Sequence, residues 1–180
     1  GYSLLEILAE KGAKKIYYSD INPDNIARVK KNYPDAELVD GKKYFSLPVD
    51  VLAPCALGAI LNPTTIKQIK APIIAGSANN QLADEITDGD ELMKRKILYA
   101  PDFVCNGGGV MNCYHELMHP YSREATLRDV DMIYGRMLEI FKIAKARKIN
   151  TQKAAILYAE KRIKEIGEVR KNFITTKSST

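Results

Sequence analysis

The chain has 180 residues, of which 46% are hydrophobic, so it can bury the core of one domain. Its mean hydropathy is -0.24, and no apolar run approaches the roughly 20 residues that cross a membrane. The net charge of +5 comes mostly from lysines between Lys142 and Lys177. Because neither interleaved aromatic residues nor a known module accompanies them, we interpret these lysines as solvated helix faces and not as a nucleic-acid surface.

Strands and helices are predicted to alternate over the first hundred residues. We expect helices over residues 2–10, 22–33, 62–70 and 90–96, and strands over residues 15–19, 36–39, 49–53, 72–75 and 97–99. Asn22 and Asn62 each precede a proline, a pair typical of a helix start. The alternation predicts an α/β fold with a parallel sheet, in which the 49–53 strand is buried.

Only helices are predicted beyond residue 100, over roughly residues 104–118, 123–147 and 151–168. We therefore divide the chain into a dinucleotide-binding domain (residues 1–150), a C-terminal helix (residues 151–170) and a polar tail (residues 171–180). The end from Phe173 onward is expected to fray. Three cysteines without a CxxC pair predict reduced thiols in a cytoplasmic protein.

Two predicted strands open into loops rich in Gly and Asn, over Ala75–Leu82 and Ala100–Asn112. Gly lets the backbone approach a ligand closely, and Asn offers both a donor and an acceptor. Ligands of open α/β sheets bind beyond the carboxyl ends of the strands. We therefore expect the functional site at these two loops.

An acidic residue, Asp20, ends the first predicted strand. In a dinucleotide-binding βαβ unit, a glycine turn opens a helix, and the next strand ends about 20 residues later in a carboxylate that binds the adenosine ribose. Gly1 stands where the last glycine of a G-x-G-x-x-G turn belongs. No Arg follows Asp20 directly, which favours NAD over NADP. The alternative is an ordinary strand-end acid that helps to start the helix at Pro23.

This spacing places the first strand upstream of Gly1, and the uncapped helix from Tyr2 also suggests missing residues there. In the usual strand order that strand is central. We therefore expect a doubly wound, Rossmann-type parallel sheet that lacks its first strand and ends in C-terminal helices. A buried unpaired backbone group costs on the order of 1–3 kcal/mol, against a total stability of roughly 5–15 kcal/mol. We expect the 180 residues by themselves to fold unstably and to be inactive.

Four blocks in order resemble the cofactor-binding domain of the leucine/phenylalanine/valine dehydrogenases, which are related to glutamate dehydrogenase. The blocks are Ser19–Asn22, Asp50–Gly58, Ile74–Leu82 and Tyr99–Asn112, and the leucine branch is the most similar. The resemblance implies NAD-dependent oxidative deamination of an aliphatic, leucine-like L-amino acid to its 2-oxo acid and ammonia. It also implies a homo-oligomer and a separate N-terminal domain that carries the catalytic residues. No catalytic residue is assigned in this chain.

The resemblance also implies roles for individual residues. Asp20 would hold the adenosine ribose, and Asn106 would face the nicotinamide and the substrate together. The full set of residues implied to bind the cofactor is Gly1, Asp20, Ile21, Cys55, Ala56, Leu57, Gly76, Ser77, Ala78, Asn79 and Asn106.

Substrate choice is implied to depend on Asn106, Val110 and Cys113. Val110 and Cys113 are three residues apart, so they share a helix face. The alternative is that they are core residues of a buried helix. Three departures from the family pattern, Gly107, Cys113 and the Tyr114–His115 pair, put the identity of the substrate in doubt more than the type of reaction.

His115 and His119 form an HExxH motif with Glu116, and Glu139 follows at the spacing of a third zinc ligand. Pro120 argues against zinc, because a residue before proline is displaced from the α region. We expect no metal site, and interpret the histidines as solvated or capping residues. A non-catalytic nucleotide-binding module stays open as the alternative to a dehydrogenase.

Overall fold

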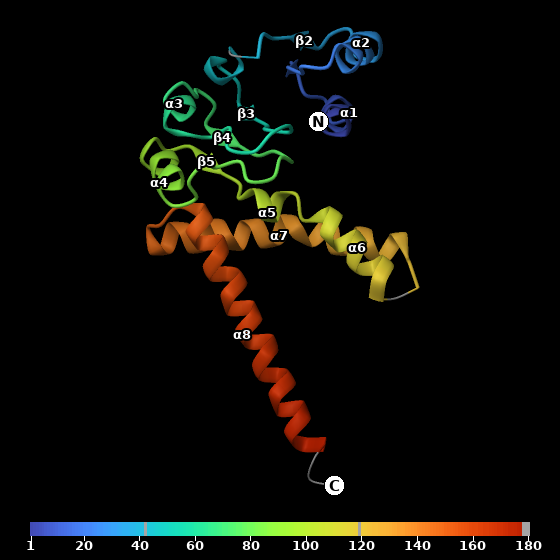
Figure 1. Ribbon diagram of the computed structural model, residues 1–180, viewed down its shortest axis with the longest axis vertical. Coiled ribbons are helices and arrows are strands. Elements are labelled where there is room, and N and C mark those ends of the chain that lie inside the picture. The colour runs from blue at the N-terminus through green and yellow to red at the C-terminus, as the bar shows by residue number, and fades with distance from the viewer. Residues whose placement is uncertain (42, 119, 178–180) are drawn as a thin grey trace.

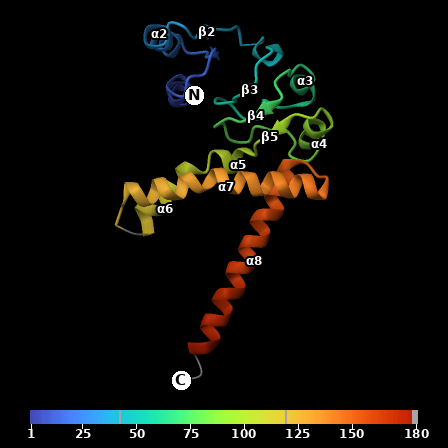
Figure 2. The same cartoon turned by 180° about the vertical axis from the view of Figure 1, so that it is seen from behind.

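A computed structural model describes residues 1–41, 43–118 and 120–177. Figure 1 shows the short strands with their helices in one part of the molecule and a layer of helices, α5 to α7, beside them. The last helix, α8, leaves this body and extends away from it, which Figure 2 shows from behind. None of the described helices is both long and apolar enough to cross a lipid bilayer.

The five strands that the structure describes form two separate parallel sheets. Strands β1 (Tyr17–Tyr18) and β2 (Glu37–Leu38) make one sheet, with Tyr17 opposite Glu37. Strands β3 (Val51–Leu52), β4 (Ile73–Ile74) and β5 (Leu98–Tyr99) make the other, in the order β3-β4-β5. This is the arrangement predicted for a doubly wound fold without its central strand: β1 and β3 would be the neighbours of that strand, and they are not paired with each other.

The prediction that the 49–53 strand is buried is wrong. Val51 in β3 is 48% exposed, and Leu52 is half-buried. The physical reason is that β3 pairs only with β4, and no strand among the described residues lies along its other edge. An apolar run thus predicts a strand that suits the centre of a sheet, but whether the strand is buried depends on the strands that pair with it.

Helices α1 (Tyr2–Glu10) and α2 (Pro23–Asn32) accompany the first sheet, and η1 (Tyr44–Ser46), α3 (Pro63–Ile66) and α4 (Thr87–Lys94) the second. Both predicted caps are confirmed. Asn22 Oδ1 accepts the backbone N–H of Asp24 at 2.8 Å, and Asn62 forms a capping box with Thr65. A satisfied first turn fixes where each helix begins.

The helical C-terminal part consists of α5 (Asp102–Cys105), α6 (Gly108–Met118), α7 (Arg123–Arg147) and α8 (Thr151–Lys177). The limits predicted for α7 are confirmed. The segment predicted as one helix over 104–118 is interrupted after Cys105, and α8 continues past the predicted end at residue 168 as far as Lys177.

Two apolar clusters hold these parts together. One lies between the second sheet and α3 and α4, and includes Leu61, Ile66, Ile74, Leu92 and Tyr99. The other joins α7 to the start of α8 through Ile140, Ala144, Ala154 and Ala155. The two are tied by polar contacts: Lys153 Nζ lies 2.8 Å from Asp90 Oδ2, and the Thr151 hydroxyl donates to the carbonyl oxygen of Tyr99 at 2.7 Å.

Candidate functional site

The loops that follow β3 and β4 lie in direct backbone contact. The N–H of Ala78 donates to the carbonyl oxygen of Pro54 at 3.0 Å. Gly76 sits so close that a Cβ on it would lie 2.1 Å from that same oxygen. Only glycine fits this position, which explains one of the glycines that the sequence placed at the site.

A buried glutamine braces the loop after β4 from inside. Gln81 is fully buried, and its Nε2 donates to the carbonyl oxygens of Gly76 at 2.9 Å and Ala78 at 3.0 Å. Asn80, just before Gln81, adopts a left-handed backbone conformation with φ 51°. Sequence reasoning missed Gln81 as a site residue, although it lies within the Ile74–Leu82 block. In the sequence, only its place in that block distinguishes Gln81 from a glutamine in a solvated loop.

The loop after β5 reaches the same place through Asn106. Its Nδ2 donates to Asn79 Oδ1 at 2.6 Å, and lies 3.5 Å from the carbonyl oxygen of Ala78. Three predicted cofactor residues from two loops are therefore brought together at the carboxyl ends of β4 and β5. Figure 1 shows these strand ends side by side, with α5 next to them.

A buried polar pair anchors α5, which carries Asn106 at its end. The Tyr99 hydroxyl donates to Asp102 Oδ1 at 3.1 Å, and both residues are buried. Burial raises the pKa of Tyr99, so this hydroxyl keeps its proton and stays a donor. Asp102 then accepts the backbone N–H of Asn106 through its carbonyl oxygen at 2.8 Å. Sequence reasoning missed this pair as well.

Cys55, Ala56 and Leu57 follow β3 as predicted, and their exposure increases along the loop from half-buried Cys55 to Leu57, which is 76% exposed. A Cβ on Gly1 would lie 3.4 Å from the Cβ of Cys55, so the start of α1 adjoins this loop. A helix start offers free N–H groups and a positive dipole end, which suit an anionic group such as a phosphate.

Asp20 follows β1, so it belongs to the other sheet. Its Oδ1 accepts the backbone N–H of Asn22 at 2.9 Å, and its Oδ2 accepts Asn25 Nδ2 at 3.0 Å. These bonds agree with the alternative of an acid that helps to start α2. The side chain is nonetheless exposed, and each oxygen has a further lone pair, so a ribose hydroxyl could also be bound. Ile21 beside it is 97% exposed.

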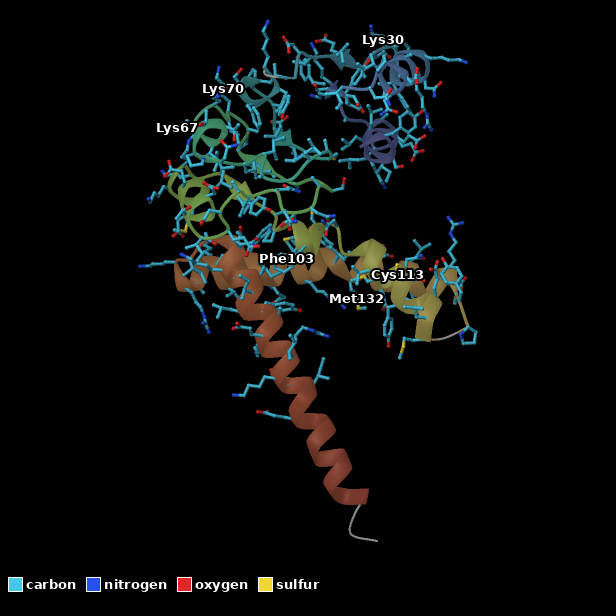
Figure 3. The ribbon with its side chains drawn as sticks, viewed as in Figure 1. Lys30, Lys67, Lys70, Phe103, Cys113 and Met132 are labelled. Carbon is cyan, nitrogen blue, oxygen red and sulfur yellow. The ribbon has the colours of Figure 1, made fainter. Side chains whose placement is uncertain are left out.

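Val110 and Cys113 lie on the surface of α6. Val110 is 75% exposed and Cys113 is exposed, so the alternative that they are core residues of a buried helix is wrong. Figure 3 shows Cys113 on α6 and Phe103 on α5, along the same layer of helices. Both predicted substrate positions are thus open to a ligand or to another part of the protein.

His115 is engaged between two helices. It is buried, and its Nε2 lies 2.8 Å from Asp129 Oδ2 on α7. His119, the other histidine of the HExxH motif, lies outside the described residues. Glu139 pairs with Lys142 one turn along α7, at 2.7 Å. The interpretation of His115 as a solvated or capping residue is therefore wrong, because its ring is buried and contacts α7. The contacts of His115 and Glu139 favour structural roles over the zinc alternative.

A groove of about 330 Å³ lies elsewhere, between α4, β5 and the turn from α7 to α8. Its lining includes Leu92, Phe141 and Lys148, and of the residues described above it shares only Tyr99 with the candidate site. It does not contribute to the candidate site.

Comparison with known proteins matches residues 6–172 to the family described as Glutamate/Leucine/Phenylalanine/Valine dehydrogenase. Leucine dehydrogenase of Thermoactinomyces intermedius is 42% identical over 173 residues, which cover 96% of this chain and 46% of that protein. L-tryptophan dehydrogenase of Nostoc punctiforme is 44% identical over 149 residues, covering 83% of this chain and 42% of that protein.

A crystal structure of L-tryptophan dehydrogenase from Nostoc punctiforme superimposes with a TM-score of 0.87 at 42% identity, covering 92% of this chain and 49% of the other. The chain thus spans about half the length of the curated relatives that it matches. The family match and these identities agree with the blocks that the sequence shares with the family, and the chain belongs to the Glutamate/Leucine/Phenylalanine/Valine dehydrogenase family.

Proposed function

We propose that this chain supplies the cofactor-binding half of an NAD-dependent amino-acid dehydrogenase. The reaction would convert a leucine-like L-amino acid, NAD and water to the 2-oxo acid, ammonia, NADH and a proton, with a hydride passing from the Cα of the amino acid to the cofactor. The observation that carries the proposal is the contact between Asn79 and Asn106, which joins the two predicted loops at the strand ends of a chain from this family.

In this proposal the cofactor lies across the carboxyl ends of the strands. Asp20 and Ile21 bind the adenosine end, and the start of α1 at Gly1 with Cys55, Ala56 and Leu57 lines the middle. Gly76, Ser77, Ala78, Asn79 and Asn106 bind the nicotinamide end. The exposed carboxylate of Asp20 and the tightly packed backbone at Gly76 are the features that fit these roles. NAD would supply the hydride acceptor.

The substrate proposal rests on α6. Val110 and Cys113 present exposed, small side chains on α6, which begins two residues after Asn106, and such side chains suit an aliphatic substrate. The relatives named above are dehydrogenases of leucine and of tryptophan, so the family holds side chains of very different size. No residue of this chain is assigned a role in proton transfer, and we propose that the acid–base groups belong to a separate domain.

Cofactor binding tests the adenosine end. In the protein as its gene encodes it, isothermal titration is expected to show tighter binding of NAD than of NADP. Asp20→Ala should weaken NAD binding about tenfold or more, because a hydrogen bond to a charged group contributes roughly 1.5–3 kcal/mol. Asp35→Ala, which removes another exposed carboxylate, serves as the control. Equal affinity of the Asp20→Ala variant and the wild-type protein for NAD would exclude the proposed role of Asp20.

Turnover tests the reaction. NADH formation is measured by absorbance with leucine, valine, isoleucine, phenylalanine and tryptophan, and we expect the highest kcat/KM with leucine or another aliphatic substrate. Binding of NAD without turnover of any amino acid would instead support the alternative of a non-catalytic nucleotide-binding module.

A further inference from the structure

The orientation of the Asn106 amide follows from the atoms around it. Its Nδ2 faces two acceptors, Asn79 Oδ1 at 2.6 Å and the carbonyl oxygen of Ala78 at 3.5 Å. Rotating the amide by half a turn would place Asn106 Oδ1 against those two oxygens, with no hydrogen between them. The shorter contact, to Asn79, therefore determines which end of the amide points outward.

The outward end is an acceptor without a partner. Among the described residues, no hydrogen bond reaches Asn106 Oδ1, and Asn106 is only half-buried. The atom is therefore open to a ligand. Because it is an oxygen, it selects for a group that carries hydrogen on nitrogen or oxygen.

The backbone is held on both sides of Asn79. Ala78 before it is 4% exposed and bonded to Pro54, and Gln81 binds the carbonyl oxygens on either side of Ser77. Asn80 after it is tied by its carbonyl oxygen to the N–H of Ala59 at 2.7 Å. The backbone on both sides of Asn79 is thus fixed to buried or neighbouring chain.

We propose that Asn79 is a positioning residue, whose side-chain oxygen turns Asn106 so that Asn106 Oδ1 accepts a hydrogen bond from a nitrogen-bound hydrogen of the bound reactants. This inference rests on the proposed function. Two groups of that reaction carry such a hydrogen: the amino group of the amino acid and the carboxamide of the nicotinamide. Both groups offer an N–H donor, so a cofactor analogue without the carboxamide distinguishes them.

The test uses three variants in the protein as its gene encodes it. Asn79→Ala removes the acceptor and is expected to lower kcat/KM about tenfold, with an unchanged melting temperature. Asn79→Asp keeps an oxygen in the same place and should restore kcat/KM to within about threefold. Asn32→Ala is the control, because it also removes a single side-chain hydrogen bond, here the one that Asn32 Nδ2 donates to the Tyr2 hydroxyl oxygen at 2.8 Å, outside the site.

A double-mutant cycle separates positioning from a general structural effect. If the Asn79 side chain acts only through Asn106, and Asn79 contacts the cofactor through its backbone, the double variant Asn79→Ala/Asn106→Ala should be no slower than Asn106→Ala alone. The cofactor analogue with an acetyl group in place of the carboxamide identifies the donor. The effect of Asn79→Ala persists with this analogue if the donor is the amino group, and disappears if it is the carboxamide.

If the wild-type protein turns over an amino acid and Asn79→Ala has the same kcat/KM, the positioning role is wrong. Fully additive effects in the cycle would mean the same. In both cases the proposed function would stand. A wild-type protein without any amino-acid-dependent turnover would overturn the proposed function, and the positioning role with it.

Discussion

Replacing Gly76 with alanine tests whether the close approach of two backbone segments builds the candidate site. The new Cβ would lie 2.1 Å from the carbonyl oxygen of Pro54, 2.5 Å from its nitrogen and 2.7 Å from its carbonyl carbon. All three are backbone atoms of a buried residue, so no side chain can rotate away. The loop after β4 must therefore move by about 1 Å to restore ordinary contact distances.

The expected loss of stability combines two effects. Overpacking a tightly packed position costs roughly 1–3 kcal/mol. The shift also breaks the hydrogen bond from the N–H of Ala78 to Pro54, which contributes about 1 kcal/mol. Together, Gly76→Ala should lower the free energy of unfolding by about 2–4 kcal/mol. Since the moved loop carries Ala78 and Asn79, the affinity for NAD should also fall, by about tenfold or more.

Urea denaturation followed by circular dichroism measures the first quantity, and isothermal titration with NAD measures the second. Gly135→Ala is the matched control, because a Cβ there meets no atom within 4 Å, and alanine favours the middle of α7 by up to about 1 kcal/mol. A Gly76→Ala protein that unfolds like the wild type and binds NAD with the same affinity would show that the loops are not held together as described.

Three further predictions concern individual contacts. The pKa of Asp90 is held below its ordinary value of 3.8 by hydrogen bonds from Lys153. The wild type should therefore be more stable than Asp90→Asn at pH 7, and this difference should shrink below about pH 4. Urea denaturation at a series of pH values measures it. Asn62→Ala should lower the free energy of unfolding by about 1 kcal/mol, because the capping box of α3 is lost; an unchanged urea midpoint would contradict this. Burial raises the pKa of Cys105, while Cys113 is exposed; mass spectrometry after brief iodoacetamide treatment should find Cys113 modified first, and equal rates would refute the difference.

The parts of the fold that could be predicted from sequence are those fixed by local signals. Asn22 and Asn62 mark helix starts because the cap and the following proline act within one turn. The beginning of α4 at Thr87, three residues before the predicted one, depends on side chains that bond across a turn. Asp84 Oδ1 accepts the N–H of Thr87 at 2.7 Å, and Asp88 Oδ2 accepts the N–H of Asp84 at 2.8 Å. Such a reciprocal pair of aspartates does not follow the usual capping pattern.

The candidate site likewise contains residues that local sequence signals reveal and residues that they do not. Gly76 and Asn106 could be named as candidates because glycine and asparagine at strand ends form recognisable blocks. The contact between Asn79 and Asn106 could not be predicted, because it depends on how the loops after β4 and β5 are placed by the sheet. Gln81 could not be recognised either, since its burial follows from packing that its own sequence neighbours do not reveal.

The separation of the two sheets leads to a last prediction about the chain by itself. Asp20 belongs to the β1–β2 sheet, whereas Asn79 and Asn106 belong to the β3–β4–β5 sheet, and no described backbone pairing connects β1 to β3. A cofactor that bridges both sheets would have to fix their separation at the expense of its own binding free energy. We therefore expect the 180 residues expressed alone to lack a cooperative melt that NAD shifts upward, whereas the protein as its gene encodes it should melt cooperatively and be stabilised by NAD. Differential scanning calorimetry with and without NAD makes the comparison. A cooperative transition of the isolated 180 residues whose midpoint rises with NAD would mean that contacts other than a shared strand hold the two sheets in register.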